Sequence, residues 1–204
     1  MEPGFNVNIK PLALLLFALP AFAAIDLEIT PADVDRALAI GRKPETETAS
    51  FHVPYIRPFE MTVDGVTVRQ VEVITPFRRL VQFGEQRRRL GDHVVSRADA
   101  DEILTPWRTR LSIVATVRFH PQNILTSIPP IEIVVRDSVL GRDVPALDGS
   151  RRAIMNAGTT KPILGATIET IFDAGLLASL HSDVIVSLRG KELVRTKIDF
   201  RAID

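Results

Sequence analysis

The sequence predicts an α+β protein, with helices in its N-terminal half and an antiparallel, sandwich-like β-sheet in its C-terminal half. Two helix-start signals, each an N-capping threonine followed by proline, occur at Thr30-Pro31 and Thr75-Pro76. After residue 107, apolar and polar residues alternate with a period of two, which is typical of strands. The segments between most of these strands are hairpin-length or irregular, which favours antiparallel pairing.

The composition excludes several classes of site. The chain has 204 residues, of which 25 are Lys or Arg and 25 are Asp or Glu, so its formal net charge is zero. Nucleic-acid-binding proteins usually carry an excess of basic residues that neutralises phosphates, so we expect no nucleic-acid partner. The absence of cysteine excludes disulfides, zinc–thiolate sites, iron–sulfur clusters and a cysteine nucleophile.

The N-terminus carries the pattern of a secretory signal peptide. Residues 12–24 (LALLLFALPAFAA) form an apolar run that follows Lys10 and contains the small-x-small sequence Ala-Phe-Ala near its end. The uncharged stretch, residues 11–25, is shorter than the roughly 20 residues that a helix needs to cross a bilayer. We therefore expect residues 1–23 to be cleaved after Ala23, leaving a mature chain without a transmembrane span. The alternative is an uncleaved membrane anchor.

The remaining chain, residues 24–204, is expected to fold as a single globular domain. At this size a domain buries roughly 70% of the surface that its unfolded chain exposes, so it can be stable without disulfides. The chain also lacks Asn-x-Ser/Thr sequons. An exported chain with neither cysteines nor sequons fits the bacterial envelope, so we expect a periplasmic or secreted protein.

The first part of this domain, residues 24–107, is predicted to be rich in helix. A helix over residues 31–41 follows from apolar residues at i, i+3 and i+4 from Val34, and it ends on a glycine. Residues 43–50 (KPETETAS) show no periodicity and are predicted to be a polar linker. Residues 51–59 are predicted to be extended, because each of their two prolines disfavours a helical conformation in the residue before it.

A hairpin and two further helices follow. The Asp64-Gly65 pair is a turn signal between two short segments rich in valine and threonine. The apolar phase switches within residues 66–74, so we expect a bulge or a bend there. The helix that begins at Thr75-Pro76 is predicted to end at Gly91. A shorter helix is predicted from Ser96 to the proline at 106, with the tryptophan at 107 in the core.

The second part, residues 108–204, is predicted to be rich in strands. The alternating segments are residues 111–119, 131–136, 164–172, 183–188 and 192–200. Residues 138–162, which contain several glycines and prolines, are predicted to be irregular. We expect residues 189–191 to form a three-residue loop, because an odd loop sets Val186 opposite Val194 and keeps the apolar faces together.

The sequence contains no standard catalytic or cofactor motif. We find no G-x-S-x-G, H-E-x-x-H, G-x-G-x-x-G, P-loop or acidic calcium loop. The four histidines are never three or four residues apart, so no pair shares a helix face for a metal. We expect no metal and no cofactor. His120 is one candidate for a functional surface because it closes a strand just before a loop; a strand-terminating hydrogen bond is its alternative role.

Arg78 and Arg89 are the two other candidates for a functional surface. Both belong to the only dense basic segment, and on the predicted helix they lie three turns apart on one face. One interpretation is a solvated face with ion pairs between residues four apart. The other is a docking stripe for an acidic partner or anionic lipid headgroups.

Taken together, the sequence favours a non-catalytic envelope protein, a binding or assembly module that holds another protein or associates with itself. One alternative is an exported hydrolase whose site assembles from distant loops, with His120 and an acid from the segment 138–148 as its candidates. Another is a peripheral membrane component that is retained by its uncleaved N-terminal segment.

Overall fold

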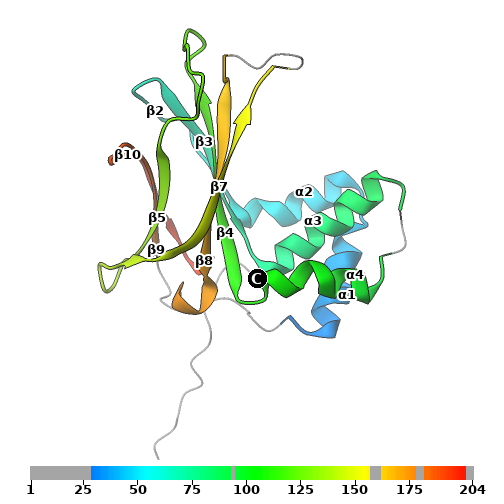
Figure 1. Cartoon of the computed structure of the whole chain (residues 1–204). Helices are drawn as coiled ribbons and strands as arrows, with labels where there is room; N and C mark the ends of the chain where they lie inside the picture. Colours follow the sequence, from blue (N-terminus) through cyan, green and yellow to red (C-terminus); the bar gives the residue numbers. More distant parts are fainter. Residues whose placement is uncertain (1–28, 93–94, 157–161, 178–181, 201–204) are drawn as a thin grey trace, which may run out of the picture.

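The computed structural model describes residues 29–92, 95–156, 162–177 and 182–200. These residues form three layers, in which two antiparallel sheets face each other and a group of helices lies against the outer face of one sheet (Figure 1). The predicted α+β class is confirmed. The predicted signal peptide, residues 1–23, lies outside the described residues. No helix within the described ranges is long and apolar enough to cross a bilayer.

The helical layer contains the predicted helices and one that we did not predict. The helices are α1 (Pro31–Gly41), α2 (Glu45–His52), α3 (Pro76–Arg89) and α4 (Arg97–Leu104). The predictions for α1, α3 and α4 are confirmed, and each begins at a threonine or serine whose side chain caps the helix. The prediction of a linker over residues 43–50 is wrong. Helix α2 buries only Thr48 among its own residues, so no apolar stripe marked it.

The larger sheet has six strands in the order β1-β3-β4-β8-β7, with β2 beside β3. Its strands are β1 (Ile56–Pro58), β2 (Thr62–Val63), β3 (Val66–Ile74), β4 (Arg110–Phe119), β7 (Ala146–Ile154) and β8 (Gly165–Asp173). The part that we expected to be helix-rich therefore also supplies three strands. Residues 51–59 are extended only at β1, because α2 and a 3-10 turn (Val53–Tyr55) precede it.

The smaller sheet has four strands in the order β10-β9-β5-β6. They are β5 (Ile131–Asp137), β6 (Asp143–Val144), β9 (Ser182–Leu188) and β10 (Lys191–Ile198). Apolar side chains from both sheets form one continuous core between them, and a smaller cluster lies among α1, α3 and α4. Short 3-10 helices at Thr105–Trp107 and Ala174–Leu177 flank β4 and β8. Trp107 is half-buried, so its predicted place in the core is wrong.

Two hairpins test the predicted turn chemistry. Asp64 and Gly65 have φ values of 51° and 74°, as a two-residue type I′ turn requires, and the predicted bulge in β3 lies at Arg69. The hairpin between β9 and β10 differs from the prediction. It turns through Arg189 and Gly190 alone, and a bulge between Glu192 and Val194 then restores the predicted pairing of Val194 with Val186.

Candidate functional site

The chain changes sheets at one point, and this opens a groove between the two sheets. The short strand β6 (Asp143–Val144) pairs with β5 in the smaller sheet. After Pro145 the chain runs on as β7, which belongs to the larger sheet. Beyond this crossover no described strand covers the outer edge of β7 or the first half of β5. A groove of about 650 Å³ lies between them.

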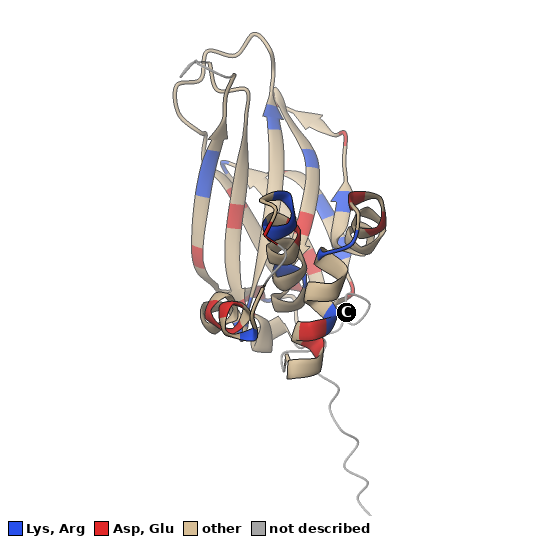
Figure 2. Ribbon diagram, turned by 90° about the vertical axis from the view of Figure 1, so that its right-hand side faces the viewer, with Lys and Arg blue, Asp and Glu red and all other residues tan. Residues whose placement is uncertain are grey.

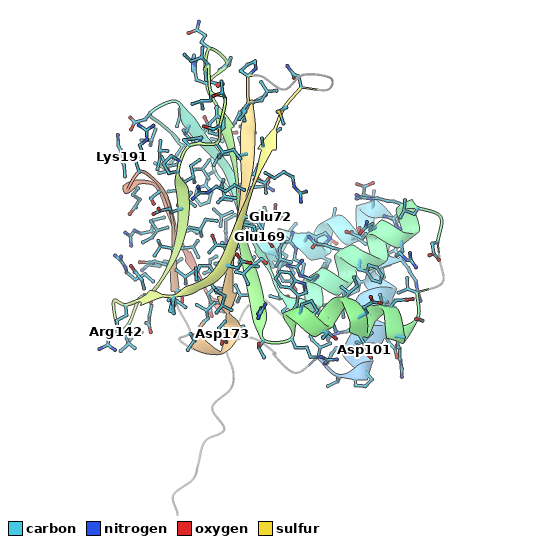
Figure 3. All side chains as sticks on the ribbon, in the orientation of Figure 1. Glu72, Asp101, Arg142, Glu169, Asp173 and Lys191 are labelled. Carbon is cyan, nitrogen blue, oxygen red and sulfur yellow. The ribbon has the colours of Figure 1, made fainter. Side chains whose placement is uncertain are left out.

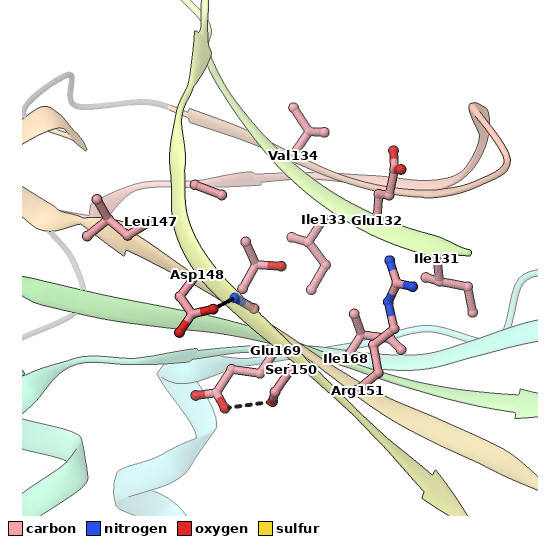
Figure 4. A pocket seen from close by; sticks show the side chains of 13 residues that line it. Ile131, Glu132, Ile133, Val134, Leu147, Asp148, Ser150, Arg151, Ile168 and Glu169 are labelled. Atoms are coloured by element: carbon pink, nitrogen blue, oxygen red, sulfur yellow. Dashed lines mark hydrogen bonds between the residues drawn. The ribbon is translucent and has the colours of Figure 1, made fainter. Parts of the chain in front are cut away.

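The groove has apolar walls with charged groups at its mouth. Ile131 and Ile133 of β5 face Ile168 of β8 across it (Figure 4). On the β7 side, Gly149 contributes no side chain, whereas Arg151 extends from β7 toward β5 (Figure 4). These β7 residues stand opposite Thr170 and Ile168 of β8, so they share the inner face of the larger sheet.

Strand β7 is the most exposed strand among the described residues. All nine of its residues are exposed except Ala153, which is half-buried, and Leu147 and Ile154 keep 50% and 40% of their surface accessible. Its inner neighbour β8 supplies backbone pairing along the whole length of β7. The other edge of β7 presents its backbone N–H and C=O groups without a described partner strand, which is the arrangement that accepts an added strand.

There is a physical reason why the sequence did not predict β7. Our prediction that residues 138–162 are irregular is wrong, because β6 and β7 lie there. A strand exposed on both faces needs no alternation of apolar residues, so the periodicity that identified the other strands was absent. The Asp148-Gly149 pair also resembles a turn signal. In the structure, Gly149 lets β7 approach β8 closely, because a Cβ there would lie only 3.1 Å from the Glu169 carbonyl oxygen.

Arg78, the first of the predicted surface residues, lies in the interior. Its side chain is only 2% exposed. Nη2 donates to Glu72 at 2.8 Å, Nη1 donates to the Val73 carbonyl at 2.7 Å, and Nε donates to Nδ1 of His52 at 3.2 Å. Arg78 therefore joins α3 to the larger sheet, and it does not belong to an exposed docking stripe. Both interpretations of this residue, as part of a solvated face or of a docking face, are wrong.

The same ionic network continues through His52 into α3. Nε2 of His52 lies 3.1 Å from Oε1 of Glu85, and both side chains are mostly buried. Because a guanidinium can only donate, Nδ1 of His52 must accept, and the ring proton of neutral His52 lies on Nε2. The network thus connects the helical layer to the sheet through polar contacts. Figure 3 shows Glu72 on the side of the sheet that faces the helices.

A second polar contact between helix and sheet centres on Arg79. Its guanidinium carbon lies 3.5 Å from the centroid of the Trp107 ring, and Nη2 donates to Ser112 at 3.0 Å. Nη2 also lies 3.7 Å from Oε1 of Glu169. Burial lowers the pKa of Arg79, and the Glu169 carboxylate opposes this shift. Ser150 of β7 in turn donates to Glu169 at 3.4 Å, which shows that Ser150 lies on the helix-facing side of β7.

Arg89 is exposed, in contrast to Arg78. Its side chain is 61% accessible and makes a long ion pair of 3.4 Å with Glu45 of α2. Lys and Arg residues alternate with Asp and Glu residues over this side of the molecule, where the helices cover only the lower part of the sheet (Figure 2). Because Arg78 is buried and Arg89 is exposed, the two arginines that were predicted to share a face do not form one surface.

His120 terminates β4 with a local hydrogen bond. Its Nδ1 accepts from the backbone N–H of Gln122 at 3.2 Å, and the backbone N–H of His120 donates to the Gly65 carbonyl. The acid Asp148 is level with Ser112, since both stand opposite Ile171, so His120 lies roughly 26 Å away along the strand direction. The structure does not bring this histidine and this acid together.

The described residues hold no group of three or more metal-ligating side chains that could bind an ion. Comparison with known protein families, with curated proteins and with solved structures finds no match for this chain. Because β7 is exposed, has an open outer edge and borders the groove, we take this edge together with the groove as the candidate site and call it the β7 edge.

Proposed function

We propose that this protein is a non-catalytic binding or assembly module, which engages another polypeptide by strand addition at the β7 edge. The observation that supports this most directly is the nine-residue exposed strand with an open outer edge. Main-chain hydrogen bonds to an added strand supply affinity, and side-chain sites beside the edge supply selectivity. The groove between β5 and β7 is such a site, with an apolar wall and the side chain of Arg151.

The other edges of the two sheets are less suited to this role. Strand β1 has three residues and ends in Pro58, and β6 has two residues and stops before Pro145. Short strands and prolines are the usual means by which proteins prevent pairing at an edge. Strand β10 is longer, but four of its eight residues are Lys, Glu or Arg. These features favour β7 over the other edges.

A selection experiment tests the proposed function without a known partner. A phage-displayed library of random dodecapeptides is panned on the purified protein, and backbone amide exchange of the protein is then measured with the selected peptides. We expect enriched peptides to slow exchange in β7 and to leave β10 unchanged. Arg151→Glu, in the groove, should weaken the binding of these peptides, whereas the matched charge reversal Glu192→Lys on β10 should not. Protection confined to other elements would contradict the proposal, and so would failure to enrich any peptide on protein that sedimentation shows to be monomeric.

We also propose that the module acts in the bacterial envelope after export. The support is the apolar segment at residues 12–24 with its small-x-small ending. Expression of the full chain in a Gram-negative host, followed by intact-mass measurement on the periplasmic fraction, tests this. The expected mass is that of residues 24–204. Recovery of the full-length chain in the cytosol would contradict export, and recovery of the full-length chain in the membrane would support the anchored alternative.

A further inference from the structure

The sequence of β7 is complementary to itself in the antiparallel direction. The strand runs from Ala146 to Ile154, so its middle residue is Ser150. Asp148 and Arg152 lie two residues before and two residues after this centre. We infer that the partner of the β7 edge is a second copy of this chain, whose β7 pairs antiparallel with a two-fold axis at Ser150. This inference rests on the proposed function and names its partner.

The two-fold axis determines which residues face one another. An axis perpendicular to the sheet keeps the faces of the two strands aligned, so only residues on the same face can stand opposite each other. Asp148, Ser150 and Arg152 stand opposite Ile171, Glu169 and Thr167 of β8, and they share the helix-facing side. With the axis at Ser150, Asp148 therefore stands opposite Arg152 of the partner subunit, and the symmetric pair forms a second time.

Neighbouring registers lose this match. An axis at Arg151 would set this arginine against its own copy, and an axis at Gly149 would set Asp148 against the second copy of Ser150. Opposite charges that face each other across antiparallel strands stabilise the pairing, and like charges destabilise it. The register centred on Ser150 is also the one in which all nine residues of the strand overlap. Charge and overlap thus select the same register.

The inner face of β7 is compatible with this register. Arg151 of one subunit stands opposite Gly149 of the other, where no side chain occupies the groove. The long arginine side chains therefore meet open space rather than each other. The bulge between Ala146 and Asp148 lies at the end of the strand, so residues 148–152 can pair regularly.

The β10 edge lacks such a register. An axis at Val194 would set Lys191 against the second copy of Lys197, and an axis at Leu193 would set Lys191 against the second copy of Arg195. An axis at Arg195 would set this residue against itself. Each central register of β10 therefore brings like charges together, which disfavours self-pairing. The comparison explains why self-association would use β7.

Charge-reversal variants test the inference with the exported chain, residues 24–204. Sedimentation velocity over a range of concentrations should show a dimer for the unmodified protein. Asp148→Arg and Arg152→Asp should each raise the dimer dissociation constant about tenfold or more, because two attractive pairs become repulsive. An equimolar mixture of these two variants should form heterodimers, and the double variant should dimerise like the unmodified chain. Glu192→Lys, a charge reversal on the β10 edge that creates no attractive pair in the central registers of β10, should leave the dimer unchanged.

The outcomes separate this inference from the function on which it rests. Rescue in the mixture supports β7 self-pairing, because a variant that had merely unfolded could not be rescued. A protein that is monomeric up to millimolar concentration, or a dimer that ignores both reversals, overturns the inference. In either case, selected peptides that still protect β7 from exchange would leave strand addition standing, with a partner other than a second copy.

Discussion

Arg78 and His52 are 26 residues apart in the sequence, and they meet with Nε of the arginine 3.2 Å from Nδ1 of the histidine. This contact lies where the helical layer meets the larger sheet. Arg78 also holds Glu72 of β3, and His52 also holds Glu85 of α3. A chain of charged and polar groups, rather than a purely apolar contact, therefore sets how the helices sit on the sheet.

Removal of the Arg78 guanidinium should destabilise the protein strongly. In Arg78→Met the alkyl part of the side chain is kept, but Glu72 loses its cationic partner and keeps only the Gln70 amide, and Nδ1 of His52 loses its donor. Breaking a buried ion pair from one side costs about 3 kcal/mol or more, because the remaining charge is left without its partner. Urea denaturation should show this loss in the free energy of unfolding. The matched variant Arg89→Met, on the exposed end of α3, should change it by no more than about 0.5 kcal/mol.

The same contact predicts the tautomer of His52. Since Arg78 occupies Nδ1 as a donor, the proton of the neutral ring should lie on Nε2, where it is donated to Glu85. Two-bond ¹H–¹⁵N correlation spectra of the uniformly labelled protein report the tautomer directly. We expect the Nε2-protonated form for His52, and a loss of this preference in Arg78→Met. A ring protonated on Nδ1 in the unmodified protein would contradict the network.

The sequence predicted local features well and long-range polar contacts poorly. The cap at Thr75 and the turn at Asp64-Gly65 depend on neighbouring residues, so their signals are complete within a few positions. The burial of Arg78 depends on His52 and on a carboxylate of β3, which only the fold brings together. A helical wheel places an arginine on the polar face, and it contains no information about a distant acid.

The candidate site was missed for a related reason. The hydrophobic pattern reports which side of an element faces a core, and β7 has almost no buried residue. Its place in the sheet follows from backbone pairing with β8, which any residue can provide. The absence of an apolar pattern is thus a property of the exposed edge itself. The charge symmetry about Ser150 was present in the sequence, but it has meaning only once the segment is known to be a strand.

Arg79 should control the fluorescence of Trp107. This is the only tryptophan in the chain, and the guanidinium covers one face of its ring at 3.5 Å. In Arg79→Ala, that face becomes accessible to water, so the emission maximum should move to longer wavelength. Loss of the cation–π contact should also lower the free energy of unfolding by about 1 kcal/mol. Arg108→Ala, which removes an exposed arginine beside Trp107 in sequence, should leave the emission maximum unchanged; equal spectra for both variants would contradict the stacking.

A methyl group at Gly41 should disrupt the contact between α1 and α3. A Cβ at this position would lie 2.4 Å from the Val81 carbonyl oxygen and 2.9 Å from the Gly84 Cα. Although alanine favours a helix by about 1 kcal/mol relative to glycine, the overlap should make Gly41→Ala destabilising by about 2 kcal/mol in thermal or urea denaturation. Gly41 is thus the last residue of α1, and its missing side chain allows α1 to pack closely against α3.

A matched glycine separates close packing from the loss of backbone freedom. Gly91, just beyond α3, has a φ of 75° and no atom near its missing Cβ. Gly91→Ala should cost about 1 kcal/mol, because only the left-handed conformation is penalised. An effect of Gly41→Ala smaller than that of Gly91→Ala would contradict the close approach of the two helices.

The capping boxes of α1 and α4 should make stability depend on acidic pH. The Thr30 and Ser96 hydroxyls donate to Asp33 and Asp99 at 2.6 Å and 2.8 Å, and these hydrogen bonds lower the pKa of both carboxyl groups. A pKa that is lower in the folded chain than in the unfolded chain stabilises the fold above the ordinary aspartate value of about 3.9. This contribution is lost as the pH falls through the lowered folded value, so the free energy of unfolding should decrease below about pH 4.

Replacement of one cap separates the two carboxyl groups. In Ser96→Ala the hydroxyl donor to Asp99 is removed, whereas the backbone N–H of residue 96 still donates. The pKa of Asp99 should therefore rise part of the way toward its ordinary value, and its share of the acid dependence should shrink. Asp33 keeps Thr30 and serves as the internal control in the same sample. A carbon-detected NMR titration of both side-chain carboxyl groups measures this. If Asp99 titrates identically with and without the Ser96 hydroxyl, its lowered pKa arises from the backbone N–H of residue 96 and the Coulombic influence of Arg87 rather than from the hydroxyl.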